Sequence, residues 1–314
     1  MIDAAEFANA LRLTVLSPPR GKTLNISAGD VNRPGIQLTG FWDYFAYERP
    51  QVLGKVEVTY LDSLSAETRA ARFDTFLSFD LPCIVICRGY ADEGKLDDLI
   101  SLAAGRGIPV YGSGLNTNRL SLDLINYLNN KLAPRVTKHG VFVDVYGVGI
   151  LIMGNSGVGK SEAALELIKR GHRLVADDVV DIRRVTDTRL VGESPEMVRH
   201  FMEIRGVGII DITTMYGIGA VIDSKSIDLV VHMENWVQGK EYDRLGMDDQ
   251  FMEILGVNVP TLLLPIHPGR NLAIVLEVAA RNQRLKQQGY IAARELDRRL
   301  MLRLRRSAED DGDS

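Results

Sequence analysis

The sequence Gly-Asn-Ser-Gly-Val-Gly-Lys-Ser at residues 154–161 constrains the fold more than any other part of the chain. It matches the pattern G-x-x-x-x-G-K-[ST] in full. Two β-rich runs precede it, at 141–146 and 149–153, and a helical pattern follows over 162–170, ending at Gly171. A strand, a glycine-rich loop and a helix in this order are typical of the phosphate-binding loop of an α/β domain.

Each residue type in this loop has a chemical reason. Glycines let backbone N–H groups turn toward phosphate oxygens, and the N-terminus of the following helix adds a partial positive charge. We expect Lys160 to neutralise the β- and γ-phosphates of ATP, and Ser161 to place its hydroxyl on Mg²⁺. The predicted nucleotide-binding residues are Gly154, Asn155, Ser156, Gly157, Val158, Gly159, Lys160 and Ser161.

The loop alone does not separate GTPases, transport ATPases and kinases. A GTPase needs the base-reading motif N-K-x-D, but the nearest string, Asn-Lys-Leu-Ala at 130–133, lacks the Asp and precedes the loop. The D-x-x-G match at 243–246 is weak, and the chain after the loop leaves little room for the long insert of a transport ATPase. A kinase acting on an alcohol needs a carboxylate close to the γ-phosphate to accept the hydroxyl proton.

A candidate for this carboxylate stands one helix after the loop. The apolar run 173–176 reads as a short strand, and it ends in Asp177 and Asp178. Spacing alone leaves a catalytic carboxylate and a structural or turn residue equally open. Glu203 is a candidate metal ligand or one half of an exposed ion pair, and His139 is unremarkable when taken by itself.

Length and hydrophobic pattern predict two domains, because 314 residues exceed what one core usually supports. We place the boundary near Pro134, which gives an N-terminal α/β domain at 1–133 and a P-loop domain at 134–314. Alternating strand and helix patterns predict a largely parallel sheet in the first domain. The predicted strands are 56–61, 84–87 and 108–111, and the predicted helices are 64–76, 96–104 and a segment from about 121.

Composition excludes several classes of partner. A net charge of −4 and a pI near 5.8 give no global positive field to gather nucleic acid. No apolar run is long enough for a membrane span, and Met1 to Leu16 lacks the pattern of a signal peptide.

The two cysteines, Cys83 and Cys87, are expected to be buried free thiols, which fits a cytoplasmic protein.

Taken together, these strings resemble the HPr kinase/phosphorylase family of bacterial carbon-source regulation, and the resemblance covers the whole chain. Five strings in order carry it, at 139–141, 154–162, 171–178, 203–208 and 265–270. The resemblance implies an N-terminal α/β domain of unclear role and a C-terminal P-loop kinase domain related to phosphoenolpyruvate carboxykinase. It also implies a hexamer.

The activity implied by the resemblance is twofold. Family members use ATP, and in some cases pyrophosphate, to phosphorylate a serine of the phosphocarrier protein HPr. They also carry out phosphorolysis of this phosphoserine by inorganic phosphate, which gives pyrophosphate. The phosphorylated carrier then acts in catabolite repression.

The matched motifs imply roles for individual residues. Asp178 resembles the general base of the kinase direction and the general acid of phosphorolysis, since the reverse reaction retraces the same proton transfer. Lys160 and Arg244 would stabilise charge on the transferred phosphoryl group. His139 belongs to the same catalytic set and would orient Asp178 or the attacking phosphate.

The same motifs imply that Ser161 and Glu203 are the metal ligands. The segment 202–211 matches a region that the family ties to catalysis, and 265–270 matches one tied mainly to phosphorolysis. Two other functions stay open: a small-molecule kinase or carboxykinase-like enzyme on the same core, and a nucleotide-sensing module without turnover. The basic pattern at 292–306 predicts a helix that is either a solvated face or a docking or subunit-contact surface.

Overall fold

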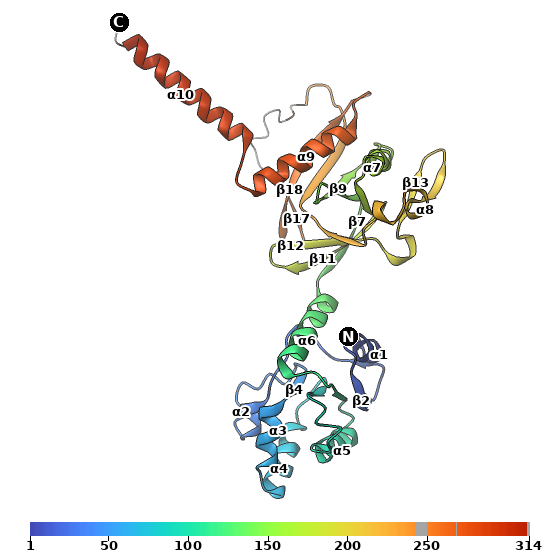
Figure 1. The fold of residues 1–314 in the computed structure, drawn as a ribbon, viewed down its shortest axis with the longest axis vertical. Coiled ribbons are helices and arrows are strands. Elements are labelled where there is room, and N and C mark those ends of the chain that lie inside the picture. Colours follow the sequence, from blue (N-terminus) through green and yellow to red (C-terminus); the bar gives the residue numbers. More distant parts are fainter. Residues whose placement is uncertain (241, 243–249, 268, 313–314) are drawn as a thin grey trace. The chain divides into compact units, whose positions relative to one another are not determined.

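The chain divides into two compact units, Met1–Ala133 and Pro134–Ser314, in a computed structural model (Figure 1). The structure describes residues 1–240, 242, 250–267 and 269–312, with side chains up to residue 302 in the last helix. Each unit has its own hydrophobic core, with two clusters of buried side chains in each.

The N-terminal unit is an α/β unit built on a four-stranded sheet with the order β2-β6-β5-β4. Strands β4, β5 and β6 are mutually parallel, and β2 is antiparallel to β6. Its elements are β1 (Ile2–Asp3), α1 (Ala4–Ala10), β2 (Thr14–Ser17), β3 (Thr23–Leu24), α2 (Gly35–Leu38), β4 (Gln51–Leu53), α3 (Lys55–Asp62), α4 (Ala66–Phe76), β5 (Ile84–Ile86), α5 (Asp97–Arg106), β6 (Val110–Gly112) and α6 (Thr117–Leu132).

The prediction of a largely parallel sheet is confirmed, and one of its strands was placed wrongly. Residues 56–61 form helix α3, and the strand is the preceding segment, β4. Val, Thr and Tyr in this segment favour a strand, but the Glu57 carboxylate accepts the Gly54 N–H at 2.9 Å and caps a helix instead. The other predicted strands and helices of this unit are present, and Cys83 and Cys87 are buried free thiols.

The C-terminal unit contains a six-stranded sheet, β10-β8-β9-β16-β18-β17, and a four-stranded sheet, β15-β12-β11-β7. Its elements are β7 (Arg135–His139), β8 (Val141–Val145), β9 (Val148–Gly154), α7 (Lys160–Lys169), β10 (Arg173–Ala176), β11 (Val179–Thr186), β12 (Arg189–Glu193), η1 (Glu196–Val198), β13 (Phe201–Ile204), β14 (Gly208–Asp211), α8 (Ile212–Tyr216), η2 (Ile218–Ala220), β15 (Ser224–Ser226), β16 (Leu229–Asn235), β17 (Gln250–Ile254), β18 (Val257–Ile266), α9 (Leu272–Gln287) and α10 (Ala292–Gly312).

Three layers make up this unit. On one face of the six-stranded sheet, Val143 and Ile150 pack against helices α7 and α9. On the other face, Phe142 and Leu151 pack against Val180 and neighbouring side chains of the four-stranded sheet. Because β8 and β9 are covered on both faces, both strands are nearly continuous apolar runs in the sequence.

Strand order brings the loop and the two acids to one edge. Strand β9 ends at Gly154, and β8 runs antiparallel to both β9 and β10, so β9 and β10 point the same way. The residues after β9 and after β10 therefore meet at the same edge of the sheet. In an open α/β sheet, this carboxyl edge is where ligands bind.

The last helix, α10, is amphipathic and confirms the helix predicted at 292–306. Leu296, Leu300 and Met301 are about half exposed, while Arg298 and Arg299 both pair with Glu295. Within the residues that the structure describes, no helix is both long and apolar enough to cross a membrane.

A tight approach at Gly140 gives the first prediction. A Cβ atom at this position would lie 2.6 Å from the backbone oxygen of Ile152, so the turn between β7 and β8 must move if a side chain is added. We expect Gly140→Ala to lower the free energy of unfolding by about 1–3 kcal/mol, measured by denaturant titration.

Gly219→Ala is the matched control in the same unit, because a Cβ atom there meets nothing within 4 Å. It should change stability by no more than about 0.5 kcal/mol. Equal stabilities of the two variants would contradict the close packing at Gly140.

Candidate active site

The phosphate-binding loop requires glycine at three positions. Gly154, Gly157 and Gly159 have φ values of +145°, +82° and +94°, a region that side chains other than glycine rarely adopt. A Cβ atom on Gly154 would also lie 2.3 Å from the backbone oxygen of Met233. After Gly159, helix α7 begins at Lys160 with no side chain bonded to its first N–H groups, which suits an incoming anion.

Lys160 lies across this loop. Its Nζ donates to the backbone oxygens of Gly154 and Asn155, at 3.0 Å in each case. The side chain is partly buried, so the ammonium group is held close to where phosphate oxygens would bind. The role expected from the motif, neutralising the β- and γ-phosphates, stays a prediction.

Asp177 is the buried centre of the site, only 7% exposed. Its Oδ1 accepts the hydroxyl of Ser161 at 2.9 Å, and its Oδ2 accepts the backbone N–H of Glu203 at 3.0 Å. Burial raises the pKa of Asp177, and these two hydrogen bonds oppose the shift. One carboxylate thus ties the phosphate loop to strand β13.

Whereas Asp177 is buried, the next residue, Asp178, is exposed to solvent. Its side chain is 79% exposed and that of His139 is 83% exposed, with 3.8 Å between His139 Nδ1 and Asp178 Oδ1. The ladder of β7 and β11 pairs His139 with Val179, and the Asp178 carbonyl accepts the Gly140 N–H at 3.0 Å. Asp178 has a left-handed backbone with φ of +64°, a conformation that Asp and Asn tolerate better than most residues.

The hairpin of β13 and β14 carries Glu203 and Arg205. Met202 anchors the hairpin in the core, 1% exposed, on the face covered by α7. At the tip, Arg205 Nη2 donates to Ser156 Oγ at 2.9 Å, and a Cβ on Gly157 would meet Arg205 Nη1 at 2.6 Å. A guanidinium group therefore lies directly beside the phosphate loop.

Sequence reasoning did not single out Asp177 or Arg205 individually. The position of Asp177 directly after a buried strand was the only signal available, and Asp178 shares it. Arg205 lies in an exposed hairpin whose place over the loop depends on contacts far apart in the chain.

Two further predictions concern Arg244 and the segment 265–270. Arg244 lies outside the residues that the structure describes. In the segment 265–270, Arg270 Nη1 donates to the Pro265 carbonyl at 3.2 Å, and the ring of His267 lies against Trp236 with 4.3 Å between centroids. Strand β18 ends at Ile266 and runs parallel to β16, and β16 runs parallel to β9. His267, directly after β18, therefore lies on the same sheet edge as the phosphate loop.

Family comparisons cover nearly the whole chain. Residues 130–300 match the family model described as the HPr Serine kinase C-terminal domain, and residues 2–128 match the HPr Serine kinase N terminus. The chain belongs to the HPr serine kinase family. The family expected from the motifs is thereby confirmed, as is a fold with an N-terminal α/β domain and a C-terminal kinase domain. The relation to phosphoenolpyruvate carboxykinase stays a prediction.

Two curated relatives and one solved structure show how similar individual proteins are to this chain. The chain is 48% identical to the HPr kinase/phosphorylase of Caldanaerobacter subterraneus subsp. tengcongensis over 291 residues, 93% of this chain and 94% of that protein. It is 48% identical to that of Alkaliphilus metalliredigens over 299 residues, 95% of this chain and 96% of that protein. The solved HPr(Ser) kinase/phosphatase of Coxiella burnetii is 38% identical, with a TM-score of 0.47, covering 51% of this chain and 98% of that one.

The donors of this HPr serine kinase family site suit a hard cation. The Ser161 hydroxyl and the backbone N–H of Glu203 are both bonded to Asp177, so the side chains of Ser161 and Asp177 lie together and the backbone of Glu203 adjoins them. Mg²⁺ prefers oxygen ligands and usually keeps water and phosphate oxygens among them. Over the described residues, no group of three or more His, Cys, Asp or Glu forms a cage of its own.

The raised pKa of Asp177 predicts a pH dependence of stability. Because the folded protein holds this proton more tightly than the unfolded chain, the contribution of Asp177 to stability should fall as pH rises from 3.8, the ordinary value, through the raised pKa. Asp177→Asn has no such group. The stability of wild type relative to Asp177→Asn should therefore decrease with rising pH, measured by urea unfolding at several pH values.

The comparison carries its own control, since all other titrating groups are shared by the two proteins. A difference that is constant with pH, or that grows in favour of wild type, would contradict the raised pKa.

Proposed function

We propose that this member of the HPr serine kinase family uses Asp178 as its proton-transferring group in phosphorylating a serine of HPr and in reversing that reaction by phosphorolysis. The protein is a serine kinase and phosphorylase of HPr, as its family and relatives indicate. One observation carries the assignment of Asp178. Its neighbour Asp177 is hydrogen-bonded to Ser161 of the phosphate loop, and Asp178 itself faces solvent.

In the kinase direction, backbone N–H groups of the loop and Lys160 hold the phosphates of ATP. The serine hydroxyl of HPr attacks the γ-phosphorus, and its proton passes to the Asp178 carboxylate. The bond from the γ-phosphorus to the bridging oxygen breaks, and ADP leaves. His139, 3.8 Å from Asp178, orients this carboxylate.

In the phosphorolysis direction, inorganic phosphate occupies the loop and attacks the phosphoserine phosphorus. The bond to the serine oxygen breaks, and Asp178 returns a proton to this oxygen as pyrophosphate forms. One carboxylate serves both directions, because each is the reverse of the other at the serine oxygen. The same geometry would accept pyrophosphate as an alternative donor to ATP.

Cations beside the loop stabilise the charge on the transferred group. Lys160 and Arg205 lie next to it, and Arg244 is proposed as a further cation on the basis of its motif. Ser161 and Glu203 would hold Mg²⁺, which when bound supplies additional positive charge to the phosphates. A hexameric assembly, a cytoplasmic location and a role in catabolite repression belong to the same proposal and rest on the family resemblance.

The function is tested by incubating the protein with radiolabelled ATP, Mg²⁺ and purified HPr, then adding inorganic phosphate to the phosphorylated product. We expect label on a serine of HPr, followed by its release as pyrophosphate. Label transferred to small acids but not to HPr would indicate a small-molecule kinase. Tight ATP binding without transfer to any acceptor would indicate a nucleotide-sensing module.

Replacing Asp178 tests the assigned base. Asp178→Asn keeps a residue that tolerates the left-handed backbone and removes the proton acceptor, so we expect both directions to slow by about 10²–10⁴-fold. Nucleotide affinity, measured by calorimetry, should stay within about twofold because Lys160 and the loop are unchanged.

Asp187→Asn, in the exposed turn between β11 and β12, is the matched control and should leave both rates unaltered. If Asp178→Asn kept the wild-type rate, another group would have to take the serine proton.

A further inference from the structure

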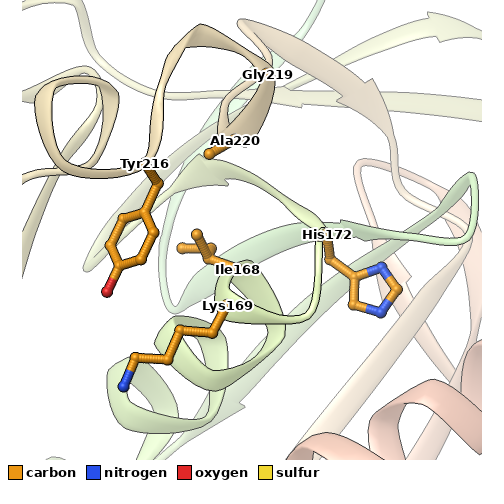
Figure 2. A pocket seen from close by; sticks show the side chains of 7 residues that line it. Ile168, Lys169, His172, Tyr216, Gly219 and Ala220 are labelled. Atoms are coloured by element: carbon orange, nitrogen blue, oxygen red, sulfur yellow. The ribbon is translucent and has the colours of Figure 1, made fainter.

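Among the cavities that described residues of the C-terminal unit line outside the site above, the two largest differ in charge. The first has a volume of about 360 Å³ and lies at the end of helix α7, where the Tyr216 and Lys169 side chains extend and His172 points away from them (Figure 2). His172 Nε2 is already hydrogen-bonded to Glu277 at 3.0 Å. Lys169 is therefore the main source of charge in this first cavity, and a single lysine offers little for recognising a ligand.

The second, called here the basic cavity, has a volume of about 480 Å³. It lies where β11, β12 and β15 of the four-stranded sheet meet the turn between β8 and β9. Its lining includes three cationic side chains, Arg183, Arg189 and Lys225, together with the hydroxyls of Ser224 and Ser226. The carboxylate in its wall is that of Asp228.

The cations of the basic cavity are only weakly neutralised. Arg183 lies 3.9 Å from a Glu193 oxygen, and the same carboxylate pairs more closely with Arg135, at 3.2 Å. Arg189 Nε donates to the neutral Ser226 hydroxyl at 2.9 Å, and no ion pair to Arg189 occurs among the described residues.

The charge of Lys225 is also only weakly neutralised. Its Nζ is 3.5 Å from an oxygen of Asp144, a carboxylate that is 2% exposed and also pairs with Arg173. Asp228, which accepts the Gly149 N–H at 2.8 Å, is one carboxylate against the three cations of the lining. Positive charge therefore exceeds negative charge around the basic cavity.

Two of the three cations are also held in place. The side chains of Arg183 and Lys225 are only 18% and 21% exposed, so their stems are ordered before any ligand arrives. Ordered donors lose less conformational entropy on binding than those on a solvated surface. Guanidinium groups suit the paired oxygens of phosphate, sulfate or carboxylate groups.

We propose that the basic cavity binds a small anion with two or more negative charges, such as a phosphate ester or a polycarboxylate. Its volume is within the usual range for small-molecule sites. It is separate from the phosphate loop, since Gly147 borders the cavity and Gly154 begins the loop, at opposite ends of β9, about 20 Å apart at the usual rise of a strand.

Sulfate is the probe, and melting temperature at constant ionic strength is the measurement. The full chain is first saturated with Mg²⁺ and a non-hydrolysable ATP analogue, which fills the phosphate loop. We expect sulfate to raise the melting temperature of wild type. Arg189→Gln and Lys225→Gln should raise the apparent Kd for sulfate by at least about fivefold, because each removes one charged donor.

Lys169→Gln is the control, since it removes a lysine charge from the cavity in Figure 2 and should leave the Kd unchanged. Arg189 is exposed, so Arg189→Gln keeps the fold even if Lys225→Gln does not. An equal rise in all variants would show a general salt effect and overturn the proposal. A rise that the ATP analogue abolishes would place sulfate in the phosphate loop and overturn it as well.

A second arm with malonate in place of sulfate distinguishes the two ligand types. Stronger stabilisation by sulfate would indicate a phosphate-type ligand, and stronger stabilisation by malonate would indicate a carboxylate.

Discussion

The hydrogen bonds of one buried carboxylate organise the active site. Asp177 accepts from the Ser161 hydroxyl at the start of α7 and from the Glu203 backbone in β13. A charged group in this environment is stabilised only when its partners stay in place, and loss of either partner leaves a costly buried charge. The phosphate loop and the hairpin that carries Glu203 and Arg205 are therefore held together.

The same turn gives Asp177 and Asp178 opposite environments. Strand β10 ends at Ala176, Asp177 points into the protein, and the left-handed backbone of Asp178 directs the chain into β11. The Asp178 and His139 side chains are left about four-fifths exposed. Such an open site suits a protein acceptor, because the docking protein can itself exclude water from the reacting groups.

The sequence predicted the local features of the site and missed those that depend on distant contacts. The loop at 154–161 is a local motif, so its strand, glycines and helix could be located from the sequence. Spacing alone could not tell Asp177 from Asp178, and only the family resemblance singled out Asp178. The hydrogen bonds that hold Asp177, from the Ser161 hydroxyl and the Glu203 backbone, join segments that lie apart in the chain. Arg205 was missed for the same reason, and the strand predicted at 56–61 failed because the Glu57 cap outweighs the strand preference of Val and Thr.

The layered core of the C-terminal unit also determines where this protein can change during evolution. Helices α7 and α9 cover one face of the six-stranded sheet and the four-stranded sheet covers the other, so substitutions in β8 and β9 disturb packing on both sides. The phosphate loop after β9 and the turn after β10 are fixed by their own contacts, whereas the connection after β16 is exposed at Val237. New specificity toward donors or acceptors can thus arise by altering short connections at one rim, while the interior remains unchanged.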